Sequence, residues 1–275
     1  MPELPEVETV KRGLARSVKG KRIEEVTIFD PSLVKGLSAG TFVRGLERRN
    51  IAEVSRRGKF LLFTLDNGKT LAVHLRMTGR MLFSDDGRPK ADKSIRAILT
   101  LSGGKQGRSY LSFSDTRRFG EWYLVRHPEE VPLISKMGPE PLGIGRDEFV
   151  MKVKEKNRQI KALLLDQEFL GGISNIYACE VLYRTGLHPK RKASRISIFN
   201  IKRLHDNIQA VLKEAIQDGG SSVRNYRRSD GSEGLFALKL AVYGRAGSPC
   251  PRCGATIKRT EISGRGTFYC PGCQR

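Results

Sequence analysis

Several features are missing from this 275-residue sequence, and each absence narrows the function. No run of about 18 apolar residues occurs, and no apolar stretch follows the first residues, so the sequence predicts neither a membrane-spanning helix nor a secretory signal peptide. It also contains no internal repeat and no low-complexity block. We therefore expect a globular protein of the reducing cytosol, long enough for two domains with cores of their own.

Acidic residues are scarce relative to basic ones. The chain has 50 Lys and Arg against 29 Asp and Glu, a formal net charge of +21. So many positive charges repel one another within the folded chain, and proteins that carry such an excess commonly bind a polyanion. A generally cationic surface is the alternative. The charge therefore favours a nucleic-acid partner, whose affinity should fall steeply as salt is added.

Cysteine is rare, but four of the five cysteines form a pattern. Two C-x2-C pairs lie sixteen residues apart, a spacing typical of a zinc ribbon: Cys250, Cys253, Cys270 and Cys273. Four thiolates fill a tetrahedral site and leave no open position, so one Zn²⁺ per chain would be structural. Two disulfides are the alternative. Three of the four histidines, His127, His188 and His205, show no ligand spacing, and we interpret them as structural.

The first residues suggest chemistry at the chain terminus. If Met1 is removed, Pro2 becomes a secondary amine whose pKa lies well below that of a lysine, so that roughly 10% is neutral near pH 7. Glu3 and Glu6 follow within one helical turn. An amine beside two acids suits Schiff-base chemistry on a carbonyl or sugar carbon; a frayed terminus is the alternative. Apolar residues at helical spacing predict a first helix that would hold the terminus: Val7, Val10, Leu14 and Val18.

Hydrophobic periodicity divides the rest of the chain. Alternating segments predict strands in a sandwich or barrel-like domain, near 23–29, 59–65, 70–77, 95–101, 109–114 and 121–125, with a tight hairpin turn at 66–68. The Pro- and Gly-rich stretch 127–145 reads as a linker. Helical periodicity follows at 147–156, 158–169, 175–185 and 197–218. The Gly-containing stretch 221–234 is either a lid or a surface loop.

Taken together, the motifs resemble the bacterial formamidopyrimidine-DNA glycosylase family (Fpg, also called MutM) over essentially the full length. The resemblance rests on PELPEVET at 2–9, RRGKF at 56–60, HLRMTGR at 74–80, DTRRFG at 115–120, GPEPL at 138–142, GGISNIYACE at 171–180, VYGRAG at 242–247 and the two cysteine pairs. It implies an α+β fold: an N-terminal β-sandwich with an N-terminal helix at 1–135, a helical helix–two-turns–helix domain with a base-capping loop at 136–235, and a zinc-ribbon hairpin at 236–275.

The family's activity is that of a bifunctional DNA glycosylase and AP lyase, which removes oxidised purines such as 8-oxoguanine and formamidopyrimidines in base excision repair. The resemblance implies that Pro2 attacks C1′ of the damaged nucleotide, that Glu3 is the general acid and that Glu6 supports the pocket. Lys59 matches the lysine assigned to β-elimination. Arg265 matches the arginine assigned to δ-elimination and phosphate contact.

DNA contacts are also implied by motif position. Met77, Arg117 and Phe119 match three residues that fill the gap left by a flipped nucleotide; without the family, Met77 and Phe119 read as core residues. The implied backbone contacts are His74, Arg117, Lys156, Lys161, Asn175 and Arg265. Around the base, the implied pocket residues are Thr78, Val223, Arg224, Asn225 and Tyr226.

The sequence departs from the family pattern at Ala91, where a DNA-contacting histidine is usual and where Lys93 offers charge nearby, and at Cys179, where an acid is usual. We interpret Cys179 as a small buried hydrophobe. Two alternatives are an endonuclease VIII-like glycosylase for oxidised pyrimidines, which typically has glycine where Leu4 stands, and a zinc-ribbon DNA-binding protein without catalysis. The expected partner is damaged double-stranded DNA, bound by a monomer in the bacterial cytosol.

Overall fold

The computed structural model describes residues 2–90, 92–222 and 226–275. Contacts within the chain divide it into two compact units: Met1–Ser135 with Asp218–Leu235, and Lys136–Gln217 with Phe236–Arg275. In the described part of the chain, no helix combines the length and the apolar character needed to cross a bilayer. The described residues of 218–235 thus pack with the first unit, although the sequence groups this segment with the helical region. The domain boundaries drawn from the sequence stay a prediction.

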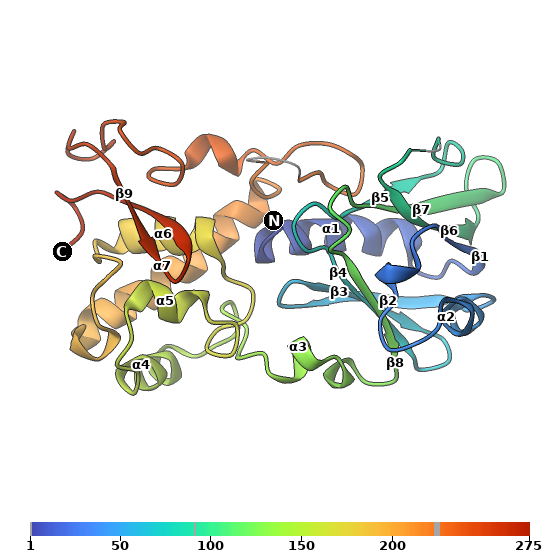
Figure 1. Cartoon of the computed structure of the whole chain (residues 1–275), viewed down its shortest axis with the longest axis horizontal. Helices are drawn as coiled ribbons and strands as arrows, with labels where there is room; N and C mark the ends of the chain where they lie inside the picture. The colour runs from blue at the N-terminus through green and yellow to red at the C-terminus, as the bar shows by residue number, and fades with distance from the viewer. Residues whose placement is uncertain (1, 91, 223–225) are drawn as a thin grey trace. The chain divides into compact units, whose positions relative to one another are not determined.

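The first unit is built on two antiparallel four-stranded sheets, as the resemblance implies (Figure 1). One sheet has the strand order β1-β6-β7-β5 and the other β2-β3-β4-β8. The strands are β1 (Ile23–Ile28), β2 (Ile51–Arg57), β3 (Phe60–Leu65), β4 (Thr70–His74), β5 (Arg80–Ser84), β6 (Ile95–Ser102), β7 (Arg108–Ser114) and β8 (Glu121–Val125). Buried side chains of both sheets form one core with helices α1 (Leu4–Val18) and α2 (Ala39–Leu46).

Six of these strands lie where the alternating pattern predicts them, and the turn at 66–68 joins β3 to β4 with Gly68 at a positive φ of 76°. The strands β2 and β5 and the helix α2 were not predicted. β2 buries only Ile51 and Val54, which are three residues apart, so the strand does not show the period-two alternation of the others. The expected linker 127–145 is also partly ordered, with a 3₁₀ turn at Pro128–Glu130 and the short α3 (Pro132–Ser135).

The second unit is helical and ends in a small hairpin. Its helices are α4 (Arg146–Lys154), α5 (Ile160–Leu165), α6 (Asn175–Thr185) and α7 (Ile198–Gln217). They share one apolar core, and the prediction for α6 matches its bounds residue for residue. The hairpin strands β9 (Lys258–Ile262) and β10 (Arg265–Tyr269) form the ribbon predicted from the cysteine spacing. Short 3₁₀ turns lie at Ala193–Arg195 and Phe236–Lys239.

Candidate active site and nucleic-acid interface

The start of α1 is fixed by a buried pair of glutamates. Glu3 caps the helix, and its backbone N–H donates to Oε2 of Glu6 at 2.8 Å. Oε1 of Glu6 accepts the backbone N–H of Ser221 at 2.7 Å. Glu3 is 2% and Glu6 1% exposed, and Pro2 is buried as well. The chain terminus is therefore held in place inside the first unit, which is contrary to a frayed end.

The stretch that follows α7 lies against this pair. Gly220 has φ of 86°, and a Cβ there would come within 3.0 Å of Cγ of Glu6, so both backbone and space require glycine. The hydroxyl of Tyr226 donates to the backbone carbonyl of Glu6 at 3.3 Å. Burial, and then the charge of Glu6, raises the pKa of Tyr226, which keeps the phenol a donor. The predicted pocket residues Val223, Arg224 and Asn225 lie outside the described residues.

Lys59 is positioned by a hairpin turn that is tied to α1. It follows Gly58, which has a positive φ of 54°, between β2 and β3. Nη1 of Arg56 donates to the carbonyl of Gly58 at 2.8 Å, and Nε of Arg56 donates to Oε2 of Glu8 at 3.0 Å. Both ends of this ion pair are nearly buried, at 9% and 11% side-chain exposure. Glu8 and Arg56 thus link the helix after Pro2 and Glu3 to the turn that carries Lys59, a connection that the sequence did not predict.

The charge of Glu8 is secured by its surroundings. Burial by itself would raise the pKa of this carboxyl, but hydrogen bonds from Lys11, Arg12 and Arg56 outweigh burial and hold the pKa below its usual value. A carboxylate that stays ionised keeps Arg56 in one orientation.

A single buried carboxylate organises the loop at 115–120. Asp115 is 1% exposed and accepts the backbone N–H groups of Arg117, Phe119 and Gly120 at 3.1, 2.8 and 2.7 Å. Its Oδ1 also accepts the hydroxyl of Thr78. Because three backbone donors of one short segment meet a single side chain, the loop has a defined shape. Asp115 lies within a motif that the resemblance quotes, but nothing in the sequence reveals its function.

The loop displays two of the three predicted wedge residues toward solvent. Phe119 is 49% exposed, and the guanidinium of Arg117 lies 4.7 Å from its ring centroid. Met77 is half-buried and does not belong to the core of the unit. The alternative reading of Met77 and Phe119 as core residues is therefore wrong. An exposed phenylalanine on a rigid loop is available to a ligand.

His74 lies at the end of β4, directly before the turn that carries Met77. Its Nδ1 accepts the backbone N–H of Arg76 at 2.9 Å, and its ring packs edge-on against Phe60. Burial, and then the charges of Arg76 and Lys59, lowers the pKa of His74 from 6.5 to about 3. The imidazole is therefore neutral near pH 7, with its proton on Nε2.

In the second unit, the start of α6 is joined to the hairpin. Lys161 is fully buried, and its Nζ donates to Oδ1 of Asn175 and to Oγ1 of Thr267, both at 2.6 Å. Nδ2 of Asn175 donates to the carbonyl of Gly266 at 2.9 Å. Two residues predicted to contact DNA are thus brought together, and one of them lies beneath the surface. Arg265 is exposed directly after the hairpin turn 263–264, and Lys156 is exposed after α4.

The four predicted metal ligands converge. Their Sγ atoms all lie within 4.8 Å of one another, and the pairs Cys253–Cys270, Cys250–Cys273 and Cys253–Cys273 are separated by 3.5, 3.8 and 3.4 Å. Bonds of 2.3 Å in a tetrahedron place sulfurs about 3.8 Å apart, so the donor set fits Zn²⁺. The four cysteines are free thiols in the structure, which does not favour the disulfide alternative.

Glu180 holds the chain that leads into this ribbon. Its carboxylate accepts the backbone N–H groups of Ala241, Val242 and Tyr243 at 2.9, 3.0 and 2.8 Å. The preceding residue, Cys179, is 1% exposed and belongs to the small core around the metal ligands, as a buried hydrophobe would.

Three family models match successive parts of the chain. They are the formamidopyrimidine-DNA glycosylase N-terminal domain at residues 1–122, the formamidopyrimidine-DNA glycosylase H2TH domain at 137–227, and the zinc finger found in FPG and IleRS at 247–275. A sandwich, a helical unit and a zinc ribbon in this order define a class of DNA glycosylases. The chain belongs to the formamidopyrimidine-DNA glycosylase family.

Relatives match over the whole length. A formamidopyrimidine-DNA glycosylase of Desulfitobacterium hafniense is 41% identical, with both chains fully covered, and one of Bacillus subtilis is 42% identical over 100% of this chain and 99% of that protein. Among solved structures, Lactococcus lactis Fpg in complex with DNA containing an abasic site is 35% identical, with a TM-score of 0.90 and both chains fully covered. MutM from Thermus thermophilus is 42% identical, with a TM-score of 0.87 over 99% of this chain and 98% of that one.

Proposed function

We propose that the protein is a bifunctional DNA glycosylase and AP lyase that removes oxidised purines from double-stranded DNA in base excision repair. The observation that carries the proposal is the buried terminus, where Pro2 and Glu3 are held by Glu6 and where Glu8 and Arg56 connect the same helix to the turn of Lys59. Pure DNA binding requires none of this. The substrate class is supported by solved relatives described in complex with 8-oxoguanine-containing or Fapy-dG-containing DNA.

The chemistry begins at the terminal amine and requires that Met1 is removed. The nitrogen of Pro2 attacks C1′, the glycosidic bond breaks, and the base leaves with a proton. Glu3, which caps the adjacent helix, supplies the proton that opens the sugar ring. The resulting iminium of a secondary amine is permanently cationic, so it acidifies the neighbouring C2′–H. Lys59 assists removal of that proton, and the 3′ phosphate leaves by β-elimination. Arg265 assists the second, δ-elimination.

Access to C1′ requires that the nucleotide leave the base stack, at a cost of a few kcal/mol. Exposed Phe119 and half-buried Met77 would enter the gap, and Arg117 would face the partner base. The loop that Asp115 holds and the turn that His74 holds give these side chains a fixed starting position.

The remaining residues predicted to contact DNA would act in different ways. Exposed Lys156 would neutralise a phosphate directly, whereas buried Lys161 would act by orienting Asn175. Neutral His74 would donate its Nε2–H to a phosphate oxygen rather than supply a charge. Thr78 and Tyr226 would border the base pocket.

We propose one Zn²⁺ per chain, held by the four cysteines. When bound, it stabilises the ribbon and takes no part in the reaction, because four thiolates leave no open coordination position. We propose further that the protein acts as a monomer in the bacterial cytosol.

The test compares three labelled duplexes: one with 8-oxoguanine, one with an oxidised pyrimidine and one without damage. We expect base release and strand cleavage on the first, with much slower reaction on the second. Faster reaction on the oxidised pyrimidine would favour the endonuclease VIII-like alternative. Binding of all three duplexes without any base release would favour the non-catalytic alternative.

A further inference from the structure

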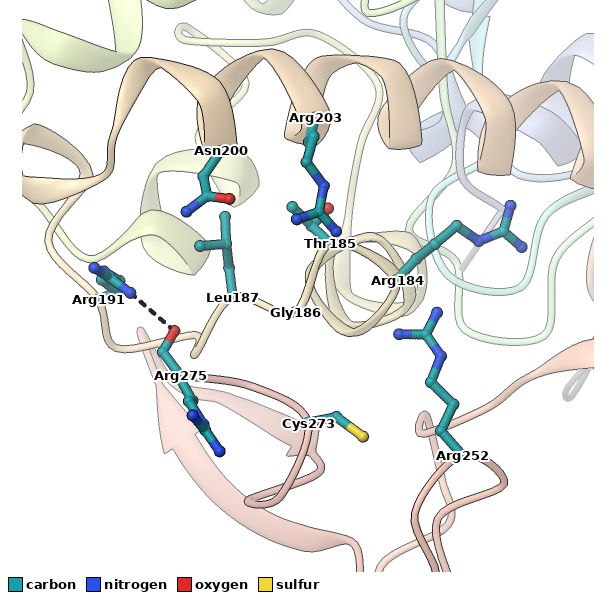
Figure 2. Close-up of a pocket in the computed structure, with 10 residues that line it drawn as sticks. All are labelled: Arg184, Thr185, Gly186, Leu187, Arg191, Asn200, Arg203, Arg252, Cys273 and Arg275. Atoms are coloured by element: carbon teal, nitrogen blue, oxygen red, sulfur yellow. Dashed lines mark hydrogen bonds between the residues drawn. The ribbon is translucent and has the colours of Figure 1, made fainter.

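A polar pocket of about 400 Å³ lies in the second unit, and none of its lining residues is among those proposed to bind DNA. It is formed where α6 ends, where α7 begins and where the two cysteine pairs of the ribbon lie (Figure 2). Asn175 stands at the other end of α6, ten residues before Thr185, which is about 15 Å along a helix. Five of the lining residues are arginines: Arg184, Arg191, Arg203, Arg252 and Arg275.

The protein holds three of these guanidinium groups by hydrogen bonds but uses few of their donors. Arg184 makes a bidentate pair with Glu214 at 2.6 and 2.8 Å. Arg252 donates to the carbonyl of Tyr183 at 3.3 Å and lies 4.4 Å from the centroid of its ring. Arg191 donates to a backbone oxygen of Arg275 at 3.2 Å. A guanidinium carries five N–H donors, so most donors of Arg191 and Arg252 remain available for a ligand.

The charges around the pocket do not balance. Glu214 is the one side-chain carboxylate that pairs with these arginines among the described residues, and the oxygen of Arg275 that Arg191 contacts belongs to the carboxylate of the last residue. Zn²⁺ bound to four thiolates would add two net negative charges beside Cys273, which also lines the pocket. Five guanidinium groups still leave a positive excess. Like charges placed together without compensation cost free energy, and such a cost is commonly met where an anion binds.

The orientations of the arginine side chains are also consistent with the binding of an anion in the pocket. Figure 2 shows Arg203 reaching from α7 and Arg252 reaching from the ribbon toward the same space, with Arg191 at its edge. Arg203 and Arg191 are exposed, and among the described residues neither pairs with a side-chain carboxylate; the guanidinium of Arg203 lies 5.7 Å from the ring centroid of Phe199. Guanidinium groups bind phosphate oxygens by paired, charge-assisted hydrogen bonds, which makes arginine the preferred residue for phosphate.

We propose that this pocket is a second anion site, separate from the lesion-binding surface, and that it takes a ligand bearing two or more neighbouring phosphate groups. A volume of about 400 Å³ exceeds what one phosphate fills and lies in the range of sites for nucleotide-sized ligands. Two sources share this chemistry: the backbone of a second nucleic-acid segment, and a free polyphosphate. The site binds either without taking part in the chemistry at Pro2.

The test uses the whole zinc-loaded protein, saturated with an uncleavable abasic-analogue duplex so that the main DNA surface is filled. Inorganic pyrophosphate is titrated calorimetrically, and zinc content is measured before and after. We expect saturable binding of one pyrophosphate per chain. The double variant Arg191→Gln/Arg203→Gln should bind about tenfold more weakly or worse. The matched control Arg195→Gln/Lys213→Gln loses the same charge at exposed positions of the same unit, outside the pocket, and should bind as the parent does.

Competition then separates the two sources. If the single strand (dT)8 displaces pyrophosphate, the ligand is a nucleic-acid backbone; if (dT)8 fails to displace it, the ligand is a free polyphosphate. Binding that does not saturate, or equal weakening in both double variants, would overturn the proposal. So would a competition titration in which hexa-aspartate, which carries no phosphate, has a lower dissociation constant than pyrophosphate. Cleavage of the 8-oxoguanine duplex should be the same in all three proteins, so failure of this proposal leaves the glycosylase assignment untouched.

Discussion

Acidification should destabilise the first unit through one histidine. The pKa of His74 is about 3 in the folded protein because of burial and the nearby charges of Arg76 and Lys59, against 6.5 when exposed. A base whose pKa falls on folding stabilises the folded state fully above pH 6.5, and this stability is lost as pH falls from 6.5 toward 3. Protonation would also place a second N–H against the donating backbone N–H of Arg76.

The magnitude follows from the two pKa values. At about pH 5 the unfolded imidazole is almost fully protonated and the folded one is not, which amounts to about 2 kcal/mol of lost stability relative to about pH 7.5. Since one pKa unit is about 1.4 kcal/mol, the effect is large compared with the error of an unfolding measurement.

The assay is urea unfolding of the parent and of His74→Asn at both pH values. Asparagine keeps an acceptor near the position of Nδ1 but does not titrate, so other groups contribute equally to both proteins and cancel. Trp122 is the single tryptophan, is fully buried and belongs to β8, which pairs with β4, so its fluorescence reports on this unit. Equal pH dependence of the parent and His74→Asn would refute the reasoning.

Three further perturbations test other parts of the account. Glu8→Gln removes the charge that orients Arg56 beside the turn of Lys59, so strand cleavage should slow by about tenfold relative to base release, while Glu25→Gln, an exposed control, should change neither rate. Lys161→Met should weaken DNA binding without changing the slope of log K against log salt, because the buried ammonium meets no phosphate, whereas Lys156→Gln should reduce that slope by about one. Protein purified without chelator should contain about one zinc per chain, and Cys253→Ser should lose the zinc and the ordered ribbon; a zinc-free protein with intact ribbon would contradict the metal assignment.

The sequence predicted those features that repeat or that stand at defined spacing. Periodicity predicted α6 and most strands, and the cysteine spacing predicted a ribbon whose four sulfurs do converge. The strand β2 was not predicted because its buried residues do not alternate with polar ones. The sequence also did not predict that Asp115 accepts three backbone hydrogen bonds or that Arg56 links Glu8 to the turn of Lys59. A single carboxylate in a sequence does not reveal which groups fold against it.

The sequence also did not predict which charged residues are buried or clustered. Lys161 looks like any basic residue of a cationic protein, yet it is fully buried between Asn175 and Thr267, more than a hundred residues away along the chain from the latter. The arginine pocket shows the same limit, because its five cations come from separate segments and only the packing of α6, α7 and the ribbon brings them together.

The central claim is that the amine of Pro2 is the nucleophile. Borohydride reduction during reaction with an 8-oxoguanine duplex should trap a covalent protein–DNA adduct, and digestion followed by mass spectrometry should locate it on the N-terminal peptide, at Pro2. Pro2→Gly should lower the yield, because a primary amine then stands in the same place. An adduct located on Lys59, or no adduct from protein whose mass shows that Met1 is absent, would contradict the account.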